Sequence, residues 1–154
     1  MEGAEANYKA ELAGNGDFAF YRKQAASLWD DALGKVTVEG GSDDDRTIFY
    51  TALYHTMIDP RCFTDVTGEY PGADGTAHVT NRYTRRTVFS GWDVFRSQFP
   101  LQTIINPVVV SDMINSFIDM AEENGSGVYD RWELLNAYSG CMLGNPAIRR
   151  ANSS

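Results

Sequence analysis

The strongest constraint on the fold is an apolar repeat of helical period that lies between clear start and stop signals. Residues 107–123 show it best, because Asn106 and Pro107 are typical of a helix start, and Asn124 and Gly125 of a helix end. The predicted buried face of this helix consists of Val110, Met113, Ile114, Phe117, Ile118 and Ala121. Such a segment favours a fold made mainly of packed helices.

A second helix is predicted over residues 18–33, where apolar residues again repeat with helical period. Asp17 precedes the repeat as a capping residue, and Gly34 ends it. Val36 and Val38 then alternate with polar residues, which predicts a short strand.

A third helix is predicted to follow Ser42. Asp45 stands at the capping-box position, and the carboxylates of the first turn suit the positive end of the helix dipole. The acidic run is therefore interpreted as a helix start rather than as a metal site. The predicted buried face consists of Ile48, Phe49, Ala52, Leu53 and Met57. His55 lies near that face, so we expect a hydrogen-bonded core histidine rather than a metal ligand.

The composition is typical of one globular domain with neither nucleic-acid nor membrane partners. The 154 residues include 43% hydrophobic and 12% aromatic residues, which is enough for a core. The formal net charge of −8 argues against phosphate binding, and Arg82, Arg85 and Arg86 are interpreted as part of a solvated loop. No apolar run approaches the roughly 20 residues of a membrane-spanning helix, and the first residues lack the apolar region of a signal peptide. Cys62 and Cys141 form no Cys-x-x-Cys pair, so two free, buried thiols are expected.

Residues 59–89 are rich in Gly, Asp, Thr and aromatic residues, which predicts a long loop with one or two short hairpins. Loops of this length in compact domains tend to be functional. Several oxygen-bearing side chains suggest calcium, but their spacing departs from the EF-hand pattern and Pro71 interrupts it. These side chains, which we interpret as turn residues, are Asp65, Thr67, Glu69 and Asp74. His78 is expected at the surface.

The stretch FSGWDVFRSQFP, residues 89–100, allows two interpretations. In the structural one, Ser90 caps a short helix, Asp93 bonds back to Ser90, and the aromatic residues belong to the core. In the functional one, Trp92, Asp93 and Arg96 line a sugar pocket. Charged groups bind sugar hydroxyls, and an aromatic face packs against the C–H side of the ring. A continuous helix would place Trp92 and Arg96 on one face.

Several blocks of the sequence resemble the family 92 glycoside hydrolases, which are calcium-dependent, exo-acting α-mannosidases. In chain order, the blocks are FYTALYHTMIDP, DVTGEYPGADG, TVFSGWDVFRSQFPLQTIINP, VSDMINSFIDMAEENG and NAYSGCMLGNPA. EGAEANYKAEL and LWDDALGKVTVEG resemble the segment that leads into that family's catalytic domain. The resemblance runs from about Glu2 to Ala147, and IRRANSS departs from it.

The resemblance implies a mainly α fold, a partial (α/α)6 toroid with short β hairpins in a long loop. It implies a single truncated domain, in which residues 1–41 are a lead-in helix and strand and residues 42–147 are the first part of the barrel. Residues 148–154 are an unmatched tail, and the region after residue 125 is expected to be a loop that approaches another helix. The polypeptide is therefore expected to be a fragment of a longer glycosidase.

The resemblance also implies the chemistry of the parent enzyme, which is release of terminal α-linked mannose from glycans by an inverting, calcium-dependent mechanism. The acid, the base and most calcium ligands are expected beyond the C-terminus, so no catalytic or metal residue is assigned here. The predicted substrate-binding residues are Trp92, Asp93, Arg96 and Trp132. Core packing is the alternative for Trp132, and Asn136 and Asn145 are expected near the mouth of the barrel as caps or as sugar contacts.

The alternative function is a non-catalytic helical module that binds carbohydrate or a protein partner. An incomplete toroid would expose apolar helix faces, so self-association through these faces is expected. The resemblance suggests that the parent is exported, while the sequence itself carries no address.

Overall fold

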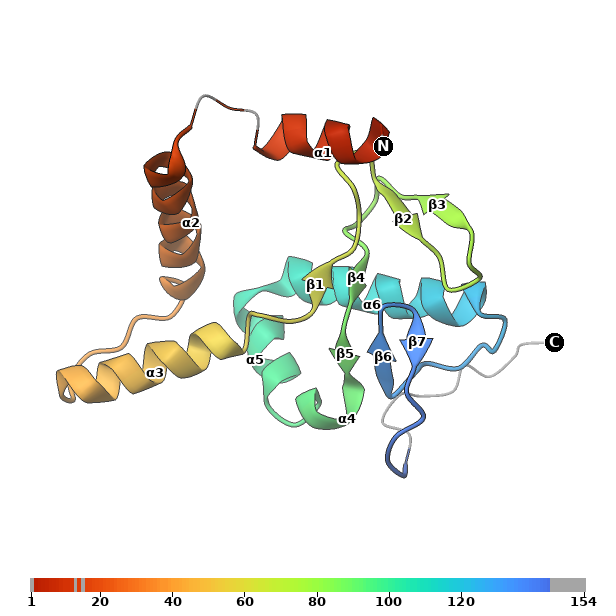
Figure 1. Cartoon of the computed structure of the whole chain (residues 1–154). Coiled ribbons are helices and arrows are strands. Elements are labelled where there is room, and N and C mark those ends of the chain that lie inside the picture. Colours follow the sequence, from red (N-terminus) through yellow and green to blue (C-terminus); the bar gives the residue numbers. More distant parts are fainter. Residues whose placement is uncertain (1, 13, 15, 145–154) are drawn as a thin grey trace. The chain divides into compact units, whose positions relative to one another are not determined.

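The computed structural model describes residues 2–12, 14 and 16–144 (Figure 1). Its longer elements are helices joined by irregular chain, and its strands are short, so the expected mainly α class is confirmed. Backbone contacts divide the chain into two compact units, a first unit up to Ile58 and a second unit from Asp59.

The first unit consists of helices with well-formed starts. Its helices are α1 (Glu2–Glu11), α2 (Phe18–Leu33) and α3 (Asp43–His55). Asp17 caps α2 by accepting a hydrogen bond from the backbone N–H of Phe20 at 2.9 Å. Ser42 and Asp45 form the predicted capping box, with bonds of 3.1 Å to the serine hydroxyl and 2.9 Å to the carboxylate. The predicted bounds of α2 and the predicted start of α3 are confirmed.

The interior of this unit is smaller than its sequence pattern predicts. Of the predicted buried face of α3, only Leu53 is buried, and Ile48 is 68% exposed. His55 is exposed rather than part of a core, and residues 36–38 form no strand. The physical reason is that α2 and α3 meet over a short stretch, where the rings of Trp29 and Tyr54 lie 4.5 Å apart.

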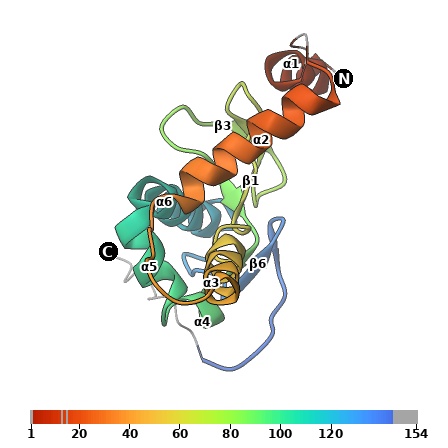
Figure 2. The same ribbon diagram turned by 90° about the vertical axis from the view of Figure 1, so that its left-hand side faces the viewer.

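The second unit is built around α6 (Pro107–Glu123), which packs against α5 (Gln98–Ile105) as Figures 1 and 2 show. The core comprises Phe89, Met113 and Met120, with Phe99, Val109, Val110 and Phe117 packed against it. The predicted bounds of α6 are confirmed. Ile114 is 54% exposed, however, and Asp112 and Ser116 are buried. The apolar pattern does not predict that these polar residues are buried, because their hydrogen-bond partners lie in other parts of the unit. Asn106 precedes α6 without a side-chain cap, since its amide donates to Gln102 at 2.7 Å.

Short antiparallel strands connect the helices of the second unit. The strands are β1 (Arg61–Cys62), β2 (Glu69–Pro71), β3 (Ala77–Val79), β4 (Arg86–Thr87), β5 (Phe89–Ser90), β6 (Trp132–Leu134) and β7 (Ala137–Tyr138). They pair as β1 with β4, β2 with β3, and β5–β6–β7. The hairpins predicted in the loop are confirmed. The third sheet replaces the expected approach to a helix after residue 125, because β6 pairs with the distant β5.

Of the arginines expected in a solvated loop, Arg85 lies in the interior and Arg86 is half-buried. Arg85 is fully buried and forms a 2.8 Å ion pair with Glu123, while Arg86 pairs with Asp112 at 3.3 Å. Acidic residues on α6 therefore compensate the positive charges of two arginines that were expected at the surface. Cys62 and Cys141 are both free, as expected, but exposed rather than buried.

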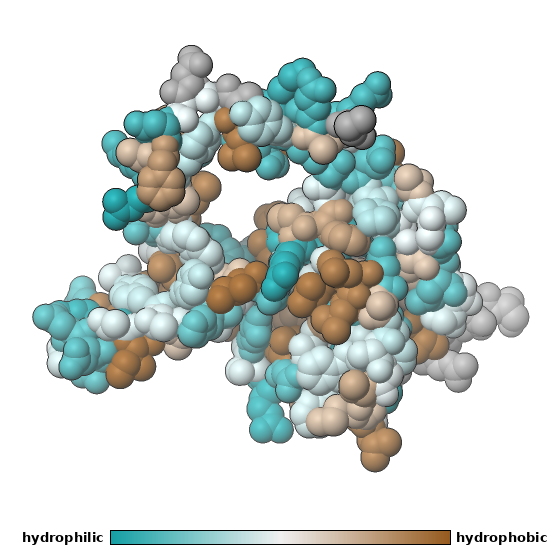
Figure 3. All heavy atoms as spheres, in the orientation of Figure 1, coloured by the Kyte–Doolittle hydropathy of each residue, from teal (hydrophilic) through white to brown (hydrophobic). Residues whose placement is uncertain are grey.

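Apolar side chains also reach the surface of each unit (Figure 3). The most exposed include Phe18, Ile48, Ile104, Val108 and Leu143. Within the described part of the chain, no helix combines the length and the apolar character that crossing a bilayer requires.

Candidate functional site

The sugar-binding residues predicted around Trp92 lie where β5 ends and a short helix, α4 (Gly91–Val94), begins. In β5, Ser90 pairs directly with Trp132 of β6. Residues directly opposite each other in an antiparallel pair project to the same face of the sheet. The pairing therefore places Trp132 beside Ser90. Trp92 and Asp93 follow Ser90 by two and three residues. Three of the four predicted residues come together in this region.

Asp93 is held by Ser90, but not in the predicted way. The serine hydroxyl donates to carboxylate oxygen Oδ2 of Asp93, and Ser90 makes no side-chain bond to the helix backbone. The predicted capping box is therefore wrong. Ser90 belongs to a paired strand, and its backbone does not have the usual conformation of a cap. The carboxylate of Asp93 remains exposed at the surface.

Trp92 is 40% exposed and is anchored through its indole, whose Nε1 donates to the carbonyl oxygen of Leu143 at 3.2 Å. Arg96 is exposed and lies in the turn between α4 and α5. Because α4 ends at Val94, a continuous helical face from Trp92 to Arg96 does not exist. The role of Arg96 thus stays a prediction without the helical argument for it.

Trp132 is half-buried, and its indole nitrogen is enclosed by protein. Among the described residues, Nε1 of Trp132 is buried without a hydrogen-bond partner. Buried donors are normally satisfied, so this unpaired indole N–H is an exception among the polar groups of the second unit.

Glu133 is a buried acid that sequence reasoning missed. It is 0% exposed and accepts hydrogen bonds from the hydroxyl of Thr87 at 2.9 and 3.0 Å, from the N–H of Val88 at 3.0 Å and from the N–H of Asn136. Burial raises the pKa of Glu133, and the bonds from Asn136, Thr87 and Val88 counteract it. The available signal was an acid between Trp132 and Leu134 in an apolar segment.

Of the loop residues weighed as calcium ligands, Asp65 and Asp74 take part in turns, and Glu69 belongs to β2. Asp74 accepts a 2.9 Å bond from the N–H of Thr76, and the N–H of Asp65 bonds to the carbonyl of Glu69 at 2.8 Å. His78, expected at the surface, is half-buried in β3 and lies within 3.0 Å of Asp74. Across the part of the chain that the structure describes, no group of three or more His, Cys, Asp or Glu side chains could hold a metal ion.

Asn136 links the β6–β7 turn to the hairpin of β2 and β3. Its side-chain amide donates to the carbonyl of Pro71 at 2.7 Å, while its Oδ1 is buried and unpaired among the described residues. A structural role is thus visible for Asn136. Asn145 lies outside the described residues.

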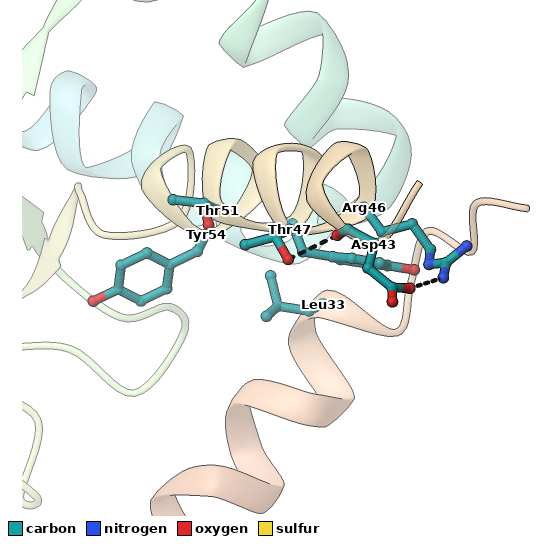
Figure 4. A pocket seen from close by; sticks show the side chains of 7 residues that line it. Leu33, Asp43, Arg46, Thr47, Thr51 and Tyr54 are labelled. Atoms are coloured by element: carbon teal, nitrogen blue, oxygen red, sulfur yellow. Dashed lines mark hydrogen bonds and ion pairs between the residues drawn. The ribbon is translucent and has the colours of Figure 1, made fainter. Parts of the chain in front are cut away.

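An open groove in the first unit contains none of the predicted site residues (Figure 4). It lies between α2 and α3 and is lined by Leu33, Asp43, Arg46, Thr47, Tyr50, Thr51 and Tyr54. Figure 4 shows that Arg46 bonds to Asp43 and that the hydroxyl of Thr47 bonds to the backbone of Asp43. The polar groups of this groove therefore stabilise the start of α3.

The chain is similar to known glycosidases. Residues 3–150 match the glycosyl hydrolase family 92 catalytic domain. A structure of the family 92 α-mannosidase from Bacteroides thetaiotaomicron is 30% identical with a TM-score of 0.86, over 94% of this chain and 19% of that chain. A structure of that α-mannosidase in complex with mannoimidazole is 28% identical, with the same TM-score and coverage.

Two further relatives agree. The family 92 glycosyl hydrolase ccman5 is 30% identical with a TM-score of 0.70, over 82% of this chain and 17% of that chain. An uncharacterized secreted glycosidase of Arthroderma benhamiae is 38% identical over 68 residues, which are 42% of this chain and 8% of that protein. The chain thus spans 19% or less of the length of these relatives. These matches confirm the expected fold class, and the chain belongs to glycosyl hydrolase family 92.

Proposed function

We propose that this chain forms part of the catalytic domain of an exo-acting α-mannosidase and supplies part of its sugar-binding wall. The family match over residues 3–150 supports a glycosidase, and the α-mannosidase structures support mannose as the sugar. The complex of one of them with mannoimidazole supports a mannose-containing glycan as the substrate. The reaction of the whole enzyme would be hydrolysis of terminal α-linked mannose.

The observation that carries this proposal is the pairing of Ser90 with Trp132, which gathers an exposed carboxylate and two indoles in one region. Asp93 would accept hydrogen bonds from sugar hydroxyls, and such charge-assisted bonds are stronger than neutral ones. Trp92 would offer an aromatic surface to the C–H side of the ring, and the half-buried Trp132 would extend that surface. Arg96, in the turn after α4, would supply a further donor.

An inverting mechanism needs a carboxylic acid and a carboxylate base, separated by roughly 6.5–9.5 Å so that a water molecule fits between base and sugar. We assign neither role to a residue of this chain, and we place the acid, the base and the calcium ligands elsewhere in the parent enzyme. The secreted relative from Arthroderma benhamiae supports export of the parent.

Calorimetric titration with methyl α-mannoside, with and without calcium, tests this function. We expect binding by the chain, loss of binding in Asp93→Ala, and unchanged binding in Asp44→Ala, which removes an exposed carboxylate from the start of α3. Equal binding by the chain and Asp93→Ala would contradict the role of Asp93. A folded chain that binds no mannoside would favour the alternative of a protein-interaction module.

A further inference from the structure

The connections between the strands near Trp92 contain three non-glycine residues in the left-handed backbone region. Val88 has φ 67°, and Leu135 and Asn136 have φ 53° and 64°. For a β-branched residue such as valine this conformation is a genuine outlier. Val88 is the only residue between β4 and β5, and Leu135 and Asn136 form the two-residue turn between β6 and β7. Such outliers persist only where the surrounding structure determines them.

One carboxylate connects all of these positions. Glu133 accepts bonds from the N–H of Val88 and from the N–H of Asn136. The hydroxyl of Thr87 donates to Glu133 and accepts a 2.9 Å bond from the N–H of Leu135. Thr87 is 1% exposed and Glu133 is 0% exposed, so water does not replace these bonds.

The chemistry of this network requires a carboxylate. An ionised carboxylate accepts through two oxygens and offers about four lone-pair sites, whereas an amide places an N–H₂ group where one oxygen stood. The donors of Val88 and Asn136 bond to different oxygens of Glu133. A glutamine at this position would therefore place its N–H₂ group opposite the N–H of Val88 or of Asn136. Two donors would then face each other at that turn.

We propose that Glu133 is a positioning residue for the sugar-binding wall. Its carboxylate fixes the turn at Val88 and the β6–β7 turn, and thereby the register in which Ser90 pairs with Trp132. That register sets where Trp92 and Asp93, two and three residues after Ser90, lie relative to Trp132. The sugar-binding part of this inference rests on the proposed function, and the geometric part stands without it.

The geometric part is tested through the indole N–H signals of Trp92 and Trp132 in a ¹⁵N-labelled chain, assigned with Trp→Phe variants. Glu133→Gln and Thr87→Val are expected to shift both signals, while Trp29 in the first unit serves as an internal reference. Thr87→Ser keeps the hydroxyl and is expected to restore the original spectrum. Asp119→Asn is the matched control, because Asp119 also accepts a bond from a hydroxyl, that of Tyr83, and no described bond joins it to β5 or β6.

Mannoside binding by the same variants tests the functional part. We expect Glu133→Gln and Thr87→Val to lower the affinity at least tenfold, and Thr87→Ser and Asp119→Asn to bind as the unchanged chain does. Unchanged indole signals and affinity in both Glu133→Gln and Thr87→Val would overturn the proposal. If Glu133→Gln fails to fold, Thr87→Val decides the result, because it keeps the carboxylate. A folded chain that binds no mannoside would count against the sugar-binding part of the proposal, and the indole spectra would still decide the role of Glu133.

Discussion

Val88 has the most demanding backbone conformation among the described residues of the second unit. Its left-handed φ of 67° turns the chain between β4 and β5, and its N–H bonds to Glu133 at 3.0 Å. For an L-residue this conformation costs roughly 1–2 kcal/mol, and glycine is free of that cost. The side chain of Val88 is half-buried, so the position combines strain with some packing.

This strain predicts an unusual order of stability at residue 88. We expect Val88→Gly to be more stable than Val88→Ala by about 0.5–1 kcal/mol, because only alanine keeps the Cβ that opposes the left-handed conformation. Urea unfolding midpoints of the two variants measure the difference. The control is Val79 in β3, where φ is not positive and alanine should be at least as stable as glycine. If the alanine variant were more stable than the glycine variant at both positions, the strain at Val88 would be contradicted.

At the scale of elements, the hairpin of β2 and β3 is fixed by contacts of β2 and of its turn. The hydroxyl of Tyr70 donates to Glu123 at 3.0 Å, and the N–H of Ala73 bonds to the same carboxylate at 2.8 Å. Burial and the carboxylate of Glu123 raise the pKa of Tyr70 to about 12. Glu123 thus joins the end of α6, the hairpin and the buried Arg85.

The turn of this hairpin contains Asp74, whose pKa is expected to be unusually low. The N–H of Thr76, then His78 and the hydroxyl of Thr76, lower the pKa of Asp74 from 3.8 to about 2. Because the pKa is lower in the folded chain, this stabilisation is complete above the unfolded value of 3.8 and is lost as pH falls through about 2.

Carboxyl ¹³C signals followed over the acid range measure the pKa of Asp74 directly. Thr76→Ala should raise the pKa only part of the way, because the backbone bond, which is the largest cause, remains. A folded chain in which Asp74 titrates near 3.8 would show that the bonds at this turn are not formed in solution.

Helix α3 depends on its cap more than a well-buried helix would, since Leu53 is its only buried side chain. We expect Ser42→Ala to cost about 1 kcal/mol of helix stability and Ser42→Asp to retain most of it. Far-UV circular dichroism over a thermal ramp measures the loss. Thr47→Ala is the control, because it removes another hydroxyl of α3 that bonds to the backbone without capping the helix start. Equal melting of Ser42→Ala and the unchanged chain would refute the cap.

The elements also show what the sequence could and could not predict. Helices α2, α3 and α6 were predicted because their signals, such as Asp17 before and Gly34 after α2, are local in the sequence. Strand β6 was missed because Trp132 pairs with Ser90, and no local pattern announces so distant a partner. Arg85 and Glu133 were missed for the same reason, since the groups that compensate buried charges lie far away in the chain.

At the scale of the whole molecule, acidic charge and exposed apolar side chains have opposite effects. The net charge of −8 keeps copies apart, whereas side chains such as Phe18 at 83% and Ile104 at 79% exposure favour contact. Salt weakens the repulsion between surface charges and leaves the apolar attraction in place.

We therefore expect the chain to self-associate and the association to increase with salt. Sedimentation at increasing concentrations, at low and at high ionic strength, measures it, and binding of a hydrophobic dye reports the exposed surface. Phe18→Lys and Ile104→Lys should each weaken the association, and Thr47→Lys, which adds the same charge at a polar position, should weaken it less. A dye-silent monomer at every concentration and salt level would contradict this prediction.

The distant bonds around Glu133 have a consequence for the order of events on the ribosome. Thr87 and Glu133 lie 46 residues apart in the chain, and Trp92 and the carbonyl of Leu143 lie 51 apart. At about 5–20 residues per second, translation needs on the order of several seconds to cover such a distance. During that interval the segment around Asp93 exists without the groups that shape it. The proposed sugar-binding wall is therefore completed only after the segment of Glu133 and Leu143 has been made, although Trp92 and Asp93 are made well before it.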